Sequence, residues 1–206
     1  SNPQSPMPPC ARATSVYVPA GGMKFLPLDA MFPRRGPVEI DIGCSKGRFL
    51  VARARAHPDV NFVGIERLLK RIRKVDGKIA RAGLDNVRLV RIEGLHAVQN
   101  MLPEGSVSAM YVFFPDPWPK RRHHRRRLFT PAFVDALAGV LMPGCMAHIM
   151  TDSLDYFEVI ESVFGASPRF EQLPFPPLPE EQRTDFELVF TGLGKPIGRA
   201  SYRRVR

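Results

Sequence analysis

The stretch that decides the fold is VEIDIGCSKG, residues 38–47. Its first half, Val38–Ile42, has apolar residues at positions 38, 40 and 42 and predicts a strand. Its second half, Gly43–Gly47, consists of small and polar residues and predicts a tight turn. A helix is expected from Arg48 to about Ala56, because His57-Pro58-Asp59 then breaks the pattern. A strand, a small-residue turn and a helix in this order are typical of the first unit of a parallel α/β sheet.

The same alternation repeats along the rest of the chain. Further strands are expected at Asn61–Ile65, Val87–Ile92, Ala109–Phe113, Ala147–Met150 and Phe186–Thr191. Helices are expected at Leu68–Ala82, Ala97–Leu102, Pro131–Leu141 and Leu154–Phe164, and a proline-rich loop at Leu173–Pro179. The pattern predicts a doubly wound, mostly parallel sheet with helices on both faces. We expect one domain over residues 16–206, preceded by a flexible tail over residues 1–15. Ligands of such sheets bind beyond the carboxyl ends of the strands.

Composition limits the class of protein. The chain has 206 residues, a net charge of +10 and a sequence pI near 10.1. It contains no apolar run of about 18 residues and no secretory signal pattern, so we expect no membrane contact. Its three cysteines lack metal-type spacing, which favours a reducing cytoplasm and no bound metal. The positive charge indicates a polyanionic partner such as nucleic acid, although surplus charge can also serve solubility alone.

Two acidic residues and the turn between them suggest a nucleoside-containing cofactor. Glu66 follows the second strand, about twenty residues after the turn, where an acid can accept hydrogen bonds from ribose hydroxyls. The dinucleotide motif G-x-G-x-x-G is absent, and Ser45 stands where its second glycine would be. Asp41 would attract the positive amino-acid end of S-adenosylmethionine but would repel a pyrophosphate. NAD is therefore disfavoured.

A rigid acidic loop and a run of cations follow the strand at Ala109–Phe113. The loop is FPDPWPK, residues 114–120, in which three prolines hold the backbone around Asp116 and Trp118. Residues 120–127 then contain six permanent cations and two histidines. Guanidinium groups suit phosphate oxygens, and Trp118 can stack on a base or pack beneath one. A solvated charged face is the alternative explanation of the run.

At this loop the sequence closely resembles the bacterial tRNA (guanine-N7-)-methyltransferase family. The resemblance is carried by FFPDPWPKRRHHRRRL, DIGCSKGRFL, FVGIERLLKRI, Thr151-Asp152 and Thr184-Asp185-Phe186-Glu187, and it extends over about residues 38–204. It implies a class I methyltransferase (Rossmann-like) fold with a seven-stranded sheet. It also implies methyl transfer from S-adenosylmethionine to N7 of a guanine in the variable loop of tRNA, by a cytoplasmic monomer or homodimer.

The resemblance also implies roles for individual residues. The catalytic residue would be Asp116. S-adenosylmethionine would be bound by Asp41, Gly43, Glu66, His96 and Asp116. The substrate would be contacted by Lys120, Asp152, Thr184, Asp185, Phe186 and Glu187. The RNA would be bound by Arg122, His123, His124, Arg125, Arg126 and Arg127. Two positions depart from the family pattern: Ser45 replaces a glycine, and His96 replaces an Asp or Asn, so that an exposed or structural role for His96 is an equal alternative.

The chemistry expected of Asp116 is recognition rather than proton removal. Guanine N7 in a nucleoside has a lone pair and no proton, so its attack on a sulfonium methyl group needs no general base. Asp116 would accept hydrogen bonds from guanine N1–H and N2–H, or it would bridge to the methionine amino group. Two other functions remain open. One is a tRNA-binding protein of methyltransferase fold with weak or lost catalysis. The other is a methyltransferase for a small molecule or a protein, for which the cations at 120–127 would be superfluous.

Overall fold

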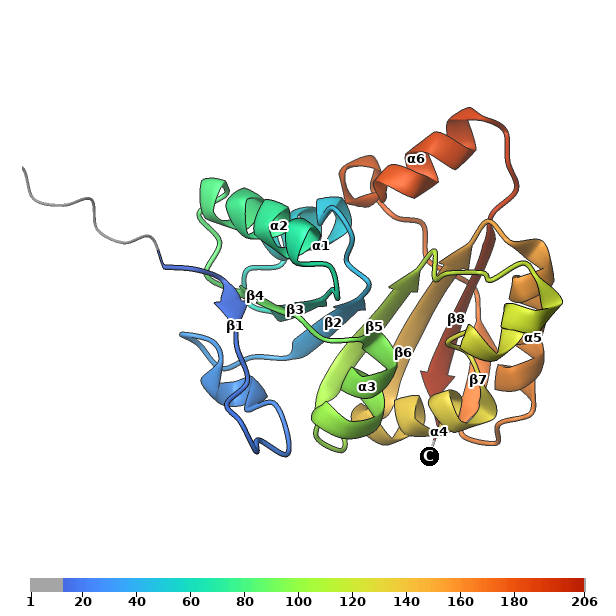
Figure 1. Cartoon of the computed structure of the whole chain (residues 1–206), viewed down its shortest axis with the longest axis horizontal. Helices are drawn as coiled ribbons and strands as arrows, with labels where there is room; N and C mark the ends of the chain where they lie inside the picture. The colour runs from blue at the N-terminus through green and yellow to red at the C-terminus, as the bar shows by residue number, and fades with distance from the viewer. Residues whose placement is uncertain (1–12, 206) are drawn as a thin grey trace, which may run out of the picture.

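A computed structural model describes residues 13–205. Its strands form one mostly parallel sheet in the order β1-β4-β3-β2-β5-β6-β8-β7, in which only β8 runs antiparallel to its neighbours (Figure 1). The strands are β1 (Val16–Tyr17), β2 (Val38–Ile42), β3 (Asn61–Ile65), β4 (Val87–Val90), β5 (Val107–Phe113), β6 (Leu141–Thr151), β7 (Phe170–Leu173) and β8 (Gly198–Arg204). The predicted mostly parallel α/β sheet is confirmed, and the two-residue strand β1 adds an eighth member at its edge.

Helices cover both faces of the sheet. They are α1 (Arg48–Ala56), α2 (Leu69–Arg81), α3 (Gly94–His96), α4 (Pro131–Val140), α5 (Leu154–Gly165) and α6 (Asp185–Gly192). Leu50 of α1 and Ile72 and Val75 of α2 pack against β3 and β4 on one face. Residues of α4 and α5, among them Phe133 and Ile160, form the larger core on the other face. Thr130 caps α4 as expected, because its side chain accepts a hydrogen bond from the Phe133 amide.

The chain joins the fold slightly before the predicted domain boundary. The expected flexible tail, residues 1–15, falls mostly on residues 1–12, which lie outside the described residues. Ser15, however, is buried, and its amide donates a 2.7 Å hydrogen bond to Asp76 of α2. The Leu89 amide of β4 in turn donates to the Ser15 carbonyl at 2.9 Å. These contacts place β1 beside β4.

One predicted element has the wrong type. The strand expected at Phe186–Thr191 is the helix α6, and the late strand that completes the sheet is β8. The helix begins at Thr184, whose hydroxyl accepts a 2.9 Å hydrogen bond from the Glu187 amide. Thr-x-x-Glu is the capping-box pattern, which favours a helix start. The strand expected at Ala147–Met150 is also longer in the structure, where β6 begins at Leu141.

The position of α6 determines the shape of the ligand-binding edge. Figure 1 shows α6 apart from the sheet, above the ends to which β5 and β6 point. Helices α1 and α2 lie farther along the sheet, on the side of β3 and β4. The loops that follow β2, β3, β4 and β5 meet at this edge, because the four strands are parallel neighbours. Ligands are therefore expected between the α1–α2 side and α6.

Candidate active site

Two adjoining cavities lie at the carboxyl edge of the sheet. The larger has a volume of about 700 Å³ and extends from the ends of β3 and β4 to the loop after β5. The smaller, of about 250 Å³, lies between the turn after β2 and the start of α6. They share five lining residues: Gly43, Ser45, Phe113, Phe114 and Phe186. A ligand in one cavity can therefore reach a ligand in the other.

The turn after β2 is held against the end of β3. The amides of Gly43 and Cys44 donate to the Ile65 carbonyl at 2.8 and 3.1 Å. Gly47, with a φ of +74°, starts α1, and a Cβ there would lie 2.6 Å from Val75 of α2. A side chain at position 47 would thus clash with α2 and strain the backbone. The turn is pinned between β3 and α2, immediately beside Glu66.

Glu66 is buried at the start of the larger cavity. One of its carboxylate oxygens accepts a 2.9 Å hydrogen bond from the Leu68 amide, and the other pairs with Arg71 at 3.4 Å. These contacts orient the carboxylate in the cavity lining, as the sequence predicts for an acid that accepts hydrogen bonds from a ribose.

Asp41 is buried beneath the smaller cavity. Burial, and secondarily the negative charge of Glu66, raise the pKa of Asp41 to about 7. Within the described part of the chain no hydrogen bond or ion pair reaches its carboxyl group. A buried acid without a protein partner is suited to bind a cationic group of a ligand.

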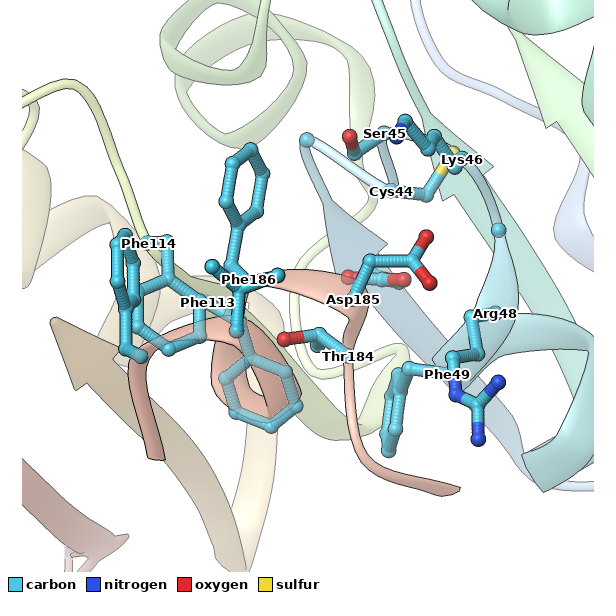
Figure 2. A pocket seen from close by; sticks show the side chains of 15 residues that line it. Cys44, Ser45, Lys46, Arg48, Phe49, Phe113, Phe114, Thr184, Asp185 and Phe186 are labelled. Atoms are coloured by element: carbon cyan, nitrogen blue, oxygen red, sulfur yellow. The ribbon is translucent and has the colours of Figure 1, made fainter. Parts of the chain in front are cut away.

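Ser45 occupies a left-handed backbone conformation that suits glycine. Its φ is +52°, and its side chain lines both cavities. In Figure 2 the Ser45 hydroxyl points toward the side of the cavity on which Phe186 lies. Serine thus takes the place of the glycine of the family pattern without changing the turn. Its hydroxyl group lies where the two cavities join.

Ser45→Gly is expected to stabilise the ligand-free protein. Glycine adopts positive φ without the steric conflict that a Cβ creates, and the relief is worth on the order of 1 kcal/mol before the entropy of glycine is subtracted. We expect the free energy of unfolding to rise by about 0.5 kcal/mol, measured by urea unfolding with Ser45→Ala as the matched control. A loss of stability in Ser45→Gly alone would show that the conformation is not strained.

The loop at 114–120 is fixed at both ends. The Phe114 amide donates a 2.7 Å hydrogen bond to the Met150 carbonyl, and Phe114 and Trp118 both have positive φ, +53° and +44°. Asp116 lies between them with an exposed side chain in the lining of the larger cavity. The geometry agrees with a carboxylate that is presented rigidly to a ligand.

Arg127 is not the surface residue that the charge run predicts. It is buried, and its guanidinium donates to the Pro117 carbonyl at 2.6 Å and to Asp155 at 2.7 Å, above the Tyr156 ring. Its guanidinium is thus engaged by groups inside the protein, and the role of Arg127 in RNA binding stays a prediction. The Arg127 side chain holds the loop that carries Asp116.

The remaining members of the basic run form a short 3-10 helix, Arg121–Arg126. Arg122, Arg125 and Arg126 are exposed, whereas His123 and His124 are half-buried. The Arg126 guanidinium lies 4.9 Å from the centre of the Trp118 ring. Arg125, Arg126 and Trp118 also line the larger cavity, so that cations and an aromatic ring are presented together at its mouth.

The start of α6 contributes three of its four predicted residues to the cavities. Thr184, Asp185 and Phe186 line the smaller cavity, and Figure 2 shows them facing the turn that contains Ser45. Glu187 is buried instead and pairs with Arg199 at 3.0 Å. Its carboxylate is therefore directed to Arg199 of β8 and not to either cavity.

Besides Glu187, three predicted cofactor- or substrate-binding residues lie outside both cavities, as do Arg122, His123 and His124 of the basic run. Lys120 is exposed and Asp152 half-buried, and neither belongs to either lining. His96 is exposed and faces Asn100, with Nδ1 3.2 Å from the amide nitrogen. The cavity is lined instead by Glu93, Gly94 and Leu95, because the short helix α3 turns the His96 side chain away. The cofactor role of His96 is thus not supported by its position.

The aromatic wall of the smaller cavity was not predicted. Phe49 of α1 packs edge-on against Phe113 at 4.9 Å, and Phe114 contacts Phe186 and Phe190 of α6 at 5.8 and 5.5 Å. The sequence signal for Phe113 and Phe114 was their place at the carboxyl end of the strand, where ligands of parallel sheets bind. The approach of α6 is a tertiary contact that no local pattern indicates.

Within residues 13–205 no three His, Cys, Asp and Glu side chains are grouped as metal ligands would be. None of the helices in this range combines the length and apolar character needed to cross a membrane.

Comparison with known proteins gives one family. Residues 35–197 match the model of a putative methyltransferase family. A tRNA (guanine-N(7)-)-methyltransferase from Halorhodospira halophila is 38% identical over 177 residues, which cover 84% of this chain and 76% of the relative. One from Nocardia farcinica is 43% identical over 143 residues, covering 69% of this chain and 53% of the relative, so this chain spans about half of that protein.

Solved structures agree with the fold. The 16S rRNA methyltransferase KamB has a TM-score of 0.62 at 16% identity, with coverage of 89% of this chain and 95% of that one. An rRNA methylase from Streptococcus thermophilus has a TM-score of 0.54 at 15% identity, with coverage of 83% and 88%. These likenesses show a class I methyltransferase fold. Together with the family model and the relatives at 36% identity and above, they show that the chain belongs to the tRNA (guanine-N(7)-)-methyltransferase family.

Proposed function

We propose that this protein transfers a methyl group from S-adenosylmethionine to N7 of a guanine in the variable loop of tRNA. The observation that carries the proposal is the single cavity of about 700 Å³ that joins Glu66 at one end to Asp116 at the other, beneath the basic helix Arg121–Arg126. The names of the relatives supply the reaction and the class of RNA. With tRNA as the proposed substrate, we also propose a cytoplasmic enzyme.

The residues at the cavity fit S-adenosylmethionine. Glu66 would hold the ribose, and the segment Glu93–Leu95 would lie against the adenine. The buried Asp41 has no partner in the described residues and would receive the positive amino group. When bound, the cofactor supplies an electrophilic methyl group on a sulfonium. The five residues shared by the two cavities lie where that group would meet the base.

The protein's contribution is position and electrostatics. Guanine N7 needs no base to remove a proton, so the rate depends on alignment of N7 with the methyl group and on stabilisation of the charge that moves to the ring. Asp116 would accept hydrogen bonds from guanine N1–H and N2–H and offset the growing positive charge, or it would bridge to the methionine amino group. Phe113, Phe114 and Phe186 bring apolar surface to the junction and exclude water from it.

Cofactor affinity should increase with pH because of Asp41. Its pKa is about 7 in the ligand-free protein, and an adjacent ammonium group favours the ionised form, so that binding below pH 7 requires loss of a proton. Between about pH 5.5 and 7.5 the ionised fraction rises roughly 20-fold, and we expect the dissociation constant measured by calorimetry to fall by a similar factor. The other acidic and basic side chains that line the same cavity are those of Lys46, Arg48 and Asp185.

The control for this pH effect is Asp41→Asn. It should bind the cofactor weakly at every pH in the same range, with the steep dependence removed. Unchanged pH dependence in Asp41→Asn would assign the titration to another group.

The direct test is incorporation of label from S-adenosylmethionine into bulk tRNA, followed by borohydride cleavage at modified guanosines. We expect label in tRNA and cleavage in the variable loop. A transcript whose variable-loop guanines are replaced by adenine should accept none. Binding of tRNA without any incorporation would instead favour a tRNA-binding protein that has lost catalysis.

A further inference from the structure

Helix α2 has two faces of opposite character. Ile72, Val75 and Ile79 are fully buried against β3 and β4. The opposite face carries what we call the basic stripe: Lys70, Arg73, Lys74 and Arg81, all exposed. Their spacing of i, i+3, i+4 and i+11 places them along one line of the helix surface. Gly77, which lies on the same line between Lys74 and Arg81, has no side chain. A Cβ at this position would lie 3.3 Å from the Arg81 guanidinium.

This arrangement opposes the stability of the helix. Like charges three and four residues apart destabilise a helix by roughly 0.2–0.5 kcal/mol per pair, and cations near its N-terminus are unfavourable to the dipole. Lys70 forms such pairs with Arg73 and Lys74, and the first turn of α2 contains no acid. Asp76, the one acidic residue of the helix, is already used by Thr14 and Ser15. If this face served only solubility, a mixture of acidic and basic side chains would hydrate it equally well and would avoid the repulsion between like charges.

The stripe lies beside the active site. Arg67, Leu68 and Arg71, at the start of α2, line the cofactor cavity from one side, while Arg125 and Arg126 line it from the other. Arg91, at the end of β4, is held next to Arg67 by a 3.2 Å hydrogen bond to the Arg67 carbonyl. No ion pair involves Lys70, Arg73, Lys74 or Arg67 among the residues that the structure describes. Positive charge therefore flanks the cavity on both sides.

We propose that the basic stripe of α2 is a second phosphate-binding surface, so that the RNA spans the active-site cleft from the helix Arg121–Arg126 to α2. The proposal rests on the proposed tRNA substrate and extends it to a surface that no motif assigns. Side chains about 5–6 Å apart in a line suit successive phosphates of a nucleic-acid backbone. The stripe presents only cationic side chains and would contact phosphates, so we expect it to add affinity rather than sequence preference.

The test compares two double variants with the same change of charge. Lys70→Ala/Lys74→Ala removes two cations from the stripe, and Arg35→Ala/Arg55→Ala removes two exposed cations near the opposite edge of the sheet, before β2 and at the end of α1. In filter binding of bulk tRNA at several salt concentrations, the stripe variant should bind roughly 10-fold more weakly near 0.1 M salt, with a log–log slope lowered by about 1.4–1.8. The control variant should keep the slope. Equal behaviour of the two variants would overturn the proposal.

A single variant separates a binding role from a structural one. Lys74→Glu places a carboxylate four residues before Lys78, an arrangement that favours the helix. Thermal stability should therefore rise or stay unchanged while tRNA affinity falls. Stability that falls together with affinity would assign the stripe to folding, and retained affinity would overturn the proposal. Cofactor titration of each variant checks that the cavity is intact.

The outcome can be told apart from failure of the proposed function, because binding and methyl transfer are measured separately. Salt-dependent binding through the stripe without methyl transfer to tRNA would retain the surface and reject the reaction. Methyl transfer to tRNA with unchanged slopes in the stripe variant would retain the reaction and reject the surface.

Discussion

Asp116→Asn is expected to lower the turnover number for tRNA methylation by at least about 100-fold. The substitution keeps the size of the side chain but removes its charge and replaces one acceptor oxygen with a donor. Asp116 lines the larger cavity from a loop whose backbone is fixed by prolines, by the Phe114 hydrogen bond to Met150 and by Arg127. Loss of one preorganised group that stabilises charge in a transition state lowers rates by roughly 10²–10³.

The same variant decides between the two roles open to Asp116. If it contacts guanine, the turnover number should fall while the dissociation constant of S-adenosylmethionine changes by less than about threefold. If it bridges to the methionine amino group, both quantities should change together. Asp135→Asn, an exposed acid on α4, is the control and should leave both unchanged. Normal methylation by Asp116→Asn would remove Asp116 from the active site.

Local patterns were sufficient for the half of the site that depends on strand ends. Asp41 lies near the end of one predicted strand and Glu66 follows the next, and parallel neighbours bring the ends of such strands together. The proline-framed Asp116 was likewise visible, because its rigidity is encoded within seven residues. For these residues the sequence spacing and the sheet topology determine position directly.

Two expectations differ from the structure, one because a local pattern was overlooked and the other because of a contact distant in sequence. The run Phe186–Thr191 is apolar enough for a strand or a helix, and the cap formed by Thr184 with Glu187 selects the helix. That cap was recognisable in the sequence as Thr-x-x-Glu. The inward position of Arg127 could not be recognised in the sequence, because nothing local distinguishes it from the other cations of the run. Its partners, Asp155 and Tyr156 of α5, lie next to it only in the folded structure.

Arg127→Met should separate this buried arginine from its exposed neighbours. The substitution retains much of the apolar volume but leaves the Pro117 carbonyl without its donor and Asp155 without its ion pair. An unsatisfied buried acceptor costs about 1–3 kcal/mol, whereas Asp155, whose side chain is 65% exposed, stays solvated and adds little. We expect a loss of about 2 kcal/mol in the free energy of unfolding and a melting temperature lower by roughly 4–8 °C. Turnover should also fall, because Pro117 adjoins Asp116.

The matched comparison is Arg125→Ala/Arg126→Ala, which removes exposed cations from the same helix. This double variant should keep its melting temperature and lose about 1.4–1.8 from the salt slope of tRNA binding, since each phosphate contact contributes roughly 0.7–0.9. Arg127→Met should do the reverse: the slope stays near that of the unaltered protein while stability and turnover fall. A lowered slope with unchanged stability in Arg127→Met would mean that the side chain leaves its internal partners to bind RNA. The contrast tests directly whether one cation of the run supports the catalytic loop while its neighbours hold the substrate.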